Sequence, residues 1–130
     1  MNAMIPAELT AVEARRLIGA RELSPVELVE SCIAQIERID PAVNAMVVRA
    51  DARARRDARD AQAAVLRGDP LGALHGLPVA IKDIQDTAGI RTTYGSHAFE
   101  HHIPTVDAGI VARIRQAGGI SPGSRSRHRP

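Results

Sequence analysis

One lysine stands apart from the other residues of this chain that could take part in chemistry. Of the 17 basic residues, 16 are arginine, and the exception is Lys82. A lysine accepts a proton only when it is neutral, so its usual pKa of about 10.4 must fall by about three units, whereas arginine stays charged over this range. Burial in a low-dielectric site can lower a lysine pKa that far. Lys82 is therefore either a general base that activates a hydroxyl nucleophile or a strand-end lysine paired with Asp83.

Three histidines form a second group of candidates. His97 and His101 have the i, i+4 spacing of a metal-binding pair on a helix, and His102 follows directly. The sequence contains no HExxH motif and no cysteine nearby, so metal binding is the disfavoured interpretation. Ser96 could line a substrate pocket, but a cap on the following turn is favoured.

Charge and motif content exclude several function classes. Three arginines fall within the last ten residues, so the first 120 residues carry 14 basic and 15 acidic groups and are close to neutral. The arginine-rich run 53–59 contains no aromatic residue on which a base could stack, which favours a solvated helix face. Cys32 is the only cysteine, which excludes a disulfide framework and a cysteine-rich zinc site. No GxGxxG or P-loop pattern occurs, and we expect neither a cofactor nor a metal.

The elements that must position Lys82 begin with helices. The sequence predicts a helix over residues 11–20, capped by Thr10, and a second helix that starts at Ser24-Pro25 and stops at Asp40-Pro41. Residues 43–48 are compatible with either an extended segment or a turn. A third helix is predicted over residues 50–67, ended by Gly68.

The pattern changes after Gly68 to that of an α/β unit. Residues 77–81 read as a short buried strand that leads into Lys82, followed by a long loop over residues 83–104. A helix is predicted over residues 106–116, and Ile120 could open another strand.

The last ten residues, 121–130, contain serine, arginine, proline and glycine where a buried strand is due. This composition predicts a disordered basic tail. A sharper hypothesis is that truncation or a frameshift has replaced the original sequence here.

One segment carries a specific resemblance. The run Leu74-His-Gly-Leu-Pro-Val-Ala-Ile-Lys-Asp83 resembles the amidase signature family. The similarity extends over about residues 8 to 120, from Ser24-Pro25-Val26-Glu27-Leu28 in the helical part to Thr87, Gly89, Thr92-Thr93, Gly95-Ser96 and Asp107-Ala108.

The resemblance implies a fold and a chemistry. Family members are amide hydrolases several hundred residues long that use a Ser–cis-Ser–Lys triad on a mixed sheet flanked by helices, and Lys82 matches the triad lysine. The two serines belong to a GSSGG-like run that is absent here, and Ser121, Ser124 and Ser126 do not match it. We therefore expect an α/β fold in which residues 1–120 form the N-terminal portion of an amidase domain that is inactive alone.

Three functional hypotheses follow from the resemblance. They are an amidase fragment acting on a small-molecule carboxamide, a fragment of the A subunit of a glutamine-dependent amidotransferase, and a truncated, non-catalytic product that packs on a partner. An unrelated helical interaction module would leave the HGLPVAIKD run unexplained. We expect no direct nucleic-acid contact, no membrane, and a possible homo-oligomer or partner subunit. The absence of an apolar span and of a secretory signal favours a cytoplasmic protein.

Overall fold

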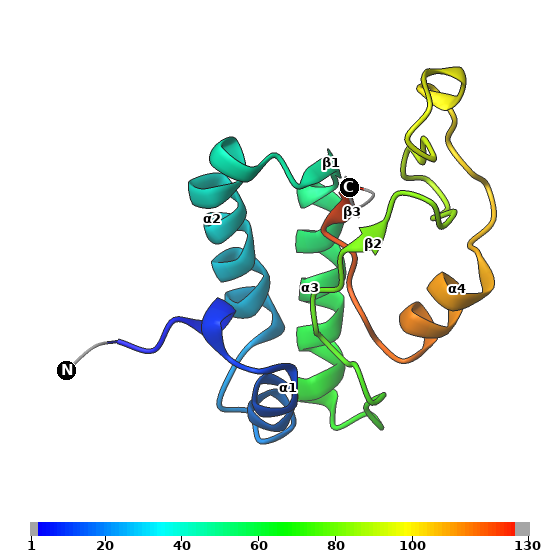
Figure 1. The fold of residues 1–130 in the computed structure, drawn as a ribbon. Helices are drawn as coiled ribbons and strands as arrows, with labels where there is room; N and C mark the ends of the chain where they lie inside the picture. Colours follow the sequence, from blue (N-terminus) through cyan, green and yellow to red (C-terminus); the bar gives the residue numbers. More distant parts are fainter. Residues whose placement is uncertain (1–2, 127–130) are drawn as a thin grey trace.

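Three helices occupy the first half of the protein in the computed structural model, which describes residues 3–126 (Figure 1). They are α1 (Ala11–Gly19), α2 (Pro25–Val43) and α3 (Asp51–Arg67), and a 3-10 turn, η1 (Pro6–Glu8), precedes them. The second half contains α4 (Gly109–Gln116), a second 3-10 turn, η2 (His97–Phe99), and two of the three short strands. Within the described residues, no helix is both long and apolar enough to cross a membrane.

The helix starts follow the predicted caps. Thr10 Oγ1 accepts a hydrogen bond from Glu13 N at 3.1 Å, and Ser24 Oγ accepts one from Val26 N at 3.0 Å. The predicted stop of the second helix at Asp40-Pro41 is wrong, because α2 continues through Pro41 to Val43. The helix ends where Asn44 adopts a left-handed conformation with φ of 49°, which asparagine tolerates better than most residues.

The strands form a small mixed sheet in the order β1–β3–β2. Strand β1 (Met46–Arg49) is antiparallel to β3 (Gly123–Arg125), and β3 is parallel to β2 (Ile81–Lys82). The structure thus divides the ambiguous segment 43–48: Val43 ends α2, and the extended part is β1 from Met46 onward. The strand predicted over residues 77–81 is shorter than expected and shifted toward Lys82, and Pro78 forms an isolated parallel bridge with Ile120 outside the sheet.

Strand β3 corrects the prediction for the end of the chain. We expected a disordered tail from residue 121, but residues 121–124 are buried and Gly123–Arg125 is the middle strand of the sheet. Backbone pairing on both sides holds this strand without an apolar run. At Gly123, with φ of +140°, a Cβ would lie 2.0 Å from the carbonyl oxygen of Val48, so only glycine fits. Residues 127–130 of the expected tail lie outside the described residues.

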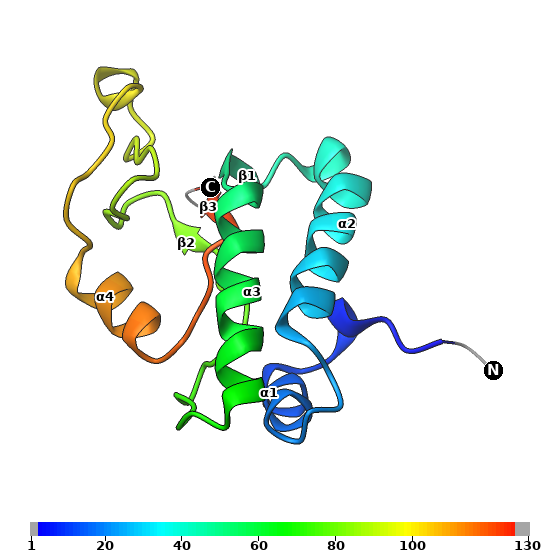
Figure 2. The same ribbon diagram turned by 180° about the vertical axis from the view of Figure 1, so that it is seen from behind.

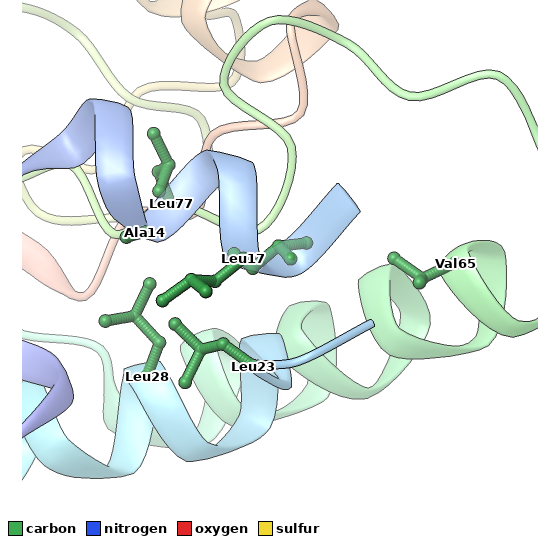
Figure 3. Packing of buried hydrophobic residues seen from close by; sticks show 7 residues of the cluster. Ala14, Leu17, Leu23, Leu28, Val65 and Leu77 are labelled. Carbon is green, nitrogen blue, oxygen red and sulfur yellow. The ribbon is translucent and has the colours of Figure 1, made fainter. Parts of the chain in front are cut away.

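The core consists of two clusters of small aliphatic residues. Figure 3 shows the first cluster, in which Leu17 of α1 and Leu28 of α2 meet around Leu23 of the segment between them. The second joins Val29 and Ile33 of α2 to three alanines of α3 and to Ile120. These contacts place α2 and α3 side by side (Figures 1 and 2), and Ile120, which leads toward β3, packs against both helices. Helix α4 lies beyond α3 in both views.

Candidate functional site

Lys82 is the last residue of β2, at an edge of the sheet. Its strand partner is Arg125 of β3, and the next residue, Asp83, donates its backbone N–H to the Arg125 carbonyl at 2.9 Å. The sheet therefore fixes the backbone on both sides of Lys82, while its side chain is partly exposed. Within residues 3–126, no carboxylate lies within ion-pair distance of the Lys82 ammonium.

The Asp83 carboxylate is engaged by a different residue. Asp83 is 2% exposed, and its Oδ1 accepts a hydrogen bond from Thr93 N at 2.9 Å. The Thr93 hydroxyl donates to the other carboxylate oxygen, so both oxygens have donors from one residue. The interpretation of Lys82 as a partner of Asp83 therefore finds no support in the geometry. Sequence reasoning missed Thr93 as the partner, because nothing in the sequence marks a contact ten residues away.

Backbone contacts fix the segment that leads into Lys82. Leu74 N donates to Ala117 O at 2.9 Å, Gly76 N to Gly118 O at 3.0 Å, and Val79 N to Ile120 O at 2.7 Å. The two segments approach so closely that a Cβ on Gly118, which has φ of +94°, would lie 2.6 Å from the Cα of His75. This close approach explains why a glycine stands at position 118.

A polar network holds the long loop after Asp83. Ala88 N donates to Asp107 Oδ1 at 2.7 Å, and the other oxygen of Asp107 pairs with Arg115 of α4 at 3.0 Å. The Tyr94 hydroxyl donates to Asp86, and this hydrogen bond raises the pKa of Tyr94 above its usual value. These contacts fasten the loop to α4, and the loop itself starts directly after the strand end at Lys82.

The histidines and Ser96 lie at the outer end of this loop. Ser96 caps η2, since its hydroxyl accepts from Ala98 N at 3.2 Å, which confirms the favoured interpretation of Ser96. The side chains of His97 and His101 are almost fully exposed, and His102 stacks on Tyr94 with ring centroids 5.7 Å apart. Among the described residues, no three histidine, cysteine or acidic side chains are grouped as metal ligands.

The arginine-rich run on α3 is partly structural. Arg53 donates to the carbonyl of Ala88 at 2.6 Å, and burial lowers the pKa of its guanidinium. Arg55 forms an ion pair with Glu30 of α2 at 2.6 Å. The solvated-face interpretation is therefore wrong for Arg53, which fastens the loop to α3.

The serines of the last segment do not surround Lys82. Ser121 Oγ donates to the carbonyl of Gly123 at 3.2 Å, and Ser124 pairs in the sheet with Ile81 rather than with Lys82. Ser124 is 4% exposed, and its hydroxyl has no hydrogen-bond partner within residues 3–126. The described chain thus places a lysine at a fixed strand end without a hydroxyl nucleophile bonded to it.

Comparison with known proteins identifies the family. Residues 27–126 match the family model of amidases. The A subunit of glutamyl-tRNA(Gln) amidotransferase from Carboxydothermus hydrogenoformans is 38% identical over 115 residues, which is 88% of this chain and 24% of that protein. An acylamidase from Rhodococcus erythropolis is 35% identical over 112 residues, which is 86% of this chain and 24% of that protein.

A solved structure extends the likeness to the fold. A bacterial aryl acylamidase of the amidase signature family superposes with a TM-score of 0.84 and 29% identity, over 90% of this chain and 25% of that structure. The chain therefore belongs to the amidase family, and its fold is that of part of an amidase signature enzyme. It spans about a quarter of the length of these three relatives.

Proposed function

We propose that this member of the amidase family carries the lysine of an amide-hydrolysing active site, and that this residue is Lys82. The observation that carries the proposal is the Asp83–Thr93 contact. Because both oxygens of the Asp83 carboxylate accept hydrogen bonds from Thr93, the neighbouring lysine is not needed as a structural counterion. Its backbone is nevertheless fixed by the sheet, as the precise placement of a proton acceptor requires.

The chemistry proposed for Lys82 is proton transfer within a Ser–cis-Ser–Lys triad. A neutral amine would accept a proton through one serine from the hydroxyl of the other, whose oxygen would then attack the carbonyl carbon of a carboxamide. The proton would pass to the departing nitrogen, which leaves as an amine or ammonia, and water would hydrolyse the acyl-enzyme ester that remains. Both serines would belong to a GSSGG-like segment, and the sequence of this chain contains no such run. We therefore propose that the 130-residue chain alone does not hydrolyse amides.

A direct assay tests the second part of the proposal. The purified chain is incubated with simple aliphatic and aryl carboxamides, and the release of ammonia or amine is measured beside an enzyme-free control. No difference from the control is expected. Turnover that is lost in Lys82→Ala would show that the chain alone is an enzyme and would overturn this part.

A chimera tests the role of Lys82. Residues 27–126 replace the matching segment of the Rhodococcus acylamidase, and the chimera is compared with its Lys82→Arg and Lys82→Ala variants. Arginine keeps the positive charge but cannot become a base near neutral pH, so both substitutions should lower kcat by at least about 100-fold, the lower end for a general base.

The control variant is Arg91→Ala, at a partly exposed position of the same loop region. Within residues 3–126 its guanidinium reaches only a backbone carbonyl, that of Glu100, at 3.0 Å. Its kcat should stay close to that of the unsubstituted chimera. An active Lys82→Arg chimera would show that Lys82 supplies charge rather than proton transfer.

A second candidate function is the amide-hydrolysing step of an amidotransferase. It rests on the relative that is the A subunit of glutamyl-tRNA(Gln) amidotransferase, at 38% identity against 35% for the acylamidase. Under this alternative the carboxamide is glutamine, and the ammonia passes to a partner subunit. Chimeras of residues 27–126 with each of the two relatives distinguish the two candidate functions. A higher kcat/KM for glutamine than for an aryl amide would favour the amidotransferase step, and the reverse would favour the amidase.

A further inference from the structure

The apolar side of α2 is divided between the core and an open groove. The sequence predicts one apolar stripe along this helix, but only Val29 and Ile33 are buried against α3. Cys32, Ile36 and Ile39, on the adjacent side of the helix, line a groove with a volume of about 480 Å³. The groove is also lined by Met46 of β1 and by Pro78, Ala80 and Pro122 of the segments beside the sheet.

Exposed apolar residues lie at and beside the groove. Ile39 is 42% exposed and Val43, one turn further along α2, is 60% exposed. Ile5, just before η1, is 42% exposed, and η1 itself packs against α2. Large apolar patches are rarely left exposed on monomeric proteins, so an open groove lined by Cys32, Ile36 and Ile39 is suited to an interface.

Two groups of opposite charge border the groove. Glu8 is exposed at its η1 side, and Arg38 is exposed on α2. The Arg38 guanidinium contacts only the neutral side chain of Gln35, at 2.6 Å, and neither Glu8 nor Arg38 has an ion-pair partner within residues 3–126. One copy of this surface therefore offers both an anion and a cation to a second copy.

We propose that the groove is the interface of a homodimer, in which a second copy of this chain packs its Ile39 side of α2 into the groove. In a two-fold interface each contact occurs twice with the roles exchanged. Glu8 of each copy would then face Arg38 of the other, while the apolar floor supplies most of the buried surface. This inference is independent of the catalytic proposal for Lys82.

The first test is the mass of the 130-residue chain as a function of its concentration, measured by sedimentation velocity. A reversible monomer–dimer equilibrium is expected. Ile39→Glu should raise the dimer dissociation constant by at least about tenfold, because it places a charge on the apolar floor. Val12→Glu is the matched control, because Val12 is 82% exposed on α1, does not line the groove, and its substitution should leave the dissociation constant unchanged.

The second test exchanges the charges. Glu8→Arg alone and Arg38→Glu alone each bring like charges together and should weaken the dimer. The double variant restores opposite charges in both symmetric contacts and should recover most of the affinity. Far-ultraviolet circular dichroism checks that every variant keeps the helical content of the parent chain.

Cys32 provides an independent readout, because it lines the groove and is the only thiol in the sequence. Its reaction with a thiol reagent should slow as the chain concentration rises, and this dependence should vanish in Ile39→Glu. A chain that is monomeric at every concentration, or a dimer that none of the groove variants weakens, would overturn the proposal. Association only with an added polypeptide carrying the remaining length of a relative would overturn it as well, and would assign the groove to that polypeptide.

Discussion

Removal of the Asp83 carboxylate should destabilise the fold by about 2–4 kcal/mol. In Asp83→Ala, the backbone N–H and the hydroxyl of Thr93 each lose the carboxylate oxygen that accepts their hydrogen bond. Thr93 is only 8% exposed, so water cannot readily replace the two lost acceptors. A buried donor left without a partner costs about 1–3 kcal/mol, and part of the sum is offset because the variant no longer buries a carboxylate.

The measurement is urea unfolding followed by circular dichroism. With a slope of about 1–3 kcal/mol per molar urea, the expected loss lowers the urea midpoint by about 0.7–4 M. Asp83→Asn separates geometry from charge. The asparagine oxygen can accept from Thr93 N and its amide can donate to the Thr93 hydroxyl, so this variant should lose about 1 kcal/mol.

The matched control is Asp69→Ala, which removes an exposed carboxylate paired with Arg67 at 2.8 Å. The free energy of unfolding of Asp69→Ala should fall by less than about 1 kcal/mol, as for other exposed ion pairs. The reasoning fails if Asp83→Ala is no more destabilising than Asp69→Ala. If Asp83→Asn proves as costly as Asp83→Ala, the charge of the carboxylate rather than its two hydrogen bonds holds Thr93.

Two further predictions concern other polar groups. Ser124→Ala should stabilise the protein by about 1 kcal/mol in urea unfolding, because it removes a buried hydroxyl that has no partner within residues 3–126; a loss of stability would show that this hydroxyl is bonded after all. Tyr94, the only tyrosine of a chain without tryptophan, should ionise above pH 10 in an ultraviolet titration, and Asp86→Asn should lower its pKa whereas Glu100→Gln should not. Since folding raises this pKa, the Tyr94–Asp86 contact stabilises the fold below about pH 10, and this stabilisation is lost as the pH rises through the folded-state pKa. An unchanged midpoint of the Tyr94 titration in Asp86→Asn would contradict this reasoning.

The helical half was predictable because its signals are local. A capping hydroxyl, a proline at the first helical position and a glycine at the end each act within one helical turn, and these positions are correct for Thr10, Ser24 and Gly68. The end of α2 was misjudged at Pro41. A proline in the last turn removes only one helical hydrogen bond, so the helix can continue past it by two residues.

The contacts around the candidate site were less predictable, because they join residues distant in the sequence. Lys82 could be selected from its uniqueness among the arginines and from the run that precedes it. The partner of Asp83 could not, since Thr93 is placed by the return of a long loop that Arg53, Asp107 and Asp86 fasten at separate points. Each of these residues is an ordinary surface type in the sequence, and only the fold gives it a partner.

Strand β3 shows how far a site can depend on a segment with almost no sequence signal. Its residues Gly123–Arg125 lack the alternation of apolar side chains typical of strands, and they were assigned to a tail for that reason. Yet this strand lies between β1 and β2, and the Arg125 carbonyl accepts the N–H of Asp83 directly after Lys82. A middle strand is specified by backbone groups on both sides, and here also by the one residue type that fits against Val48. The placement of Lys82 therefore depends on backbone geometry at Gly123 as much as on the HGLPVAIKD run itself.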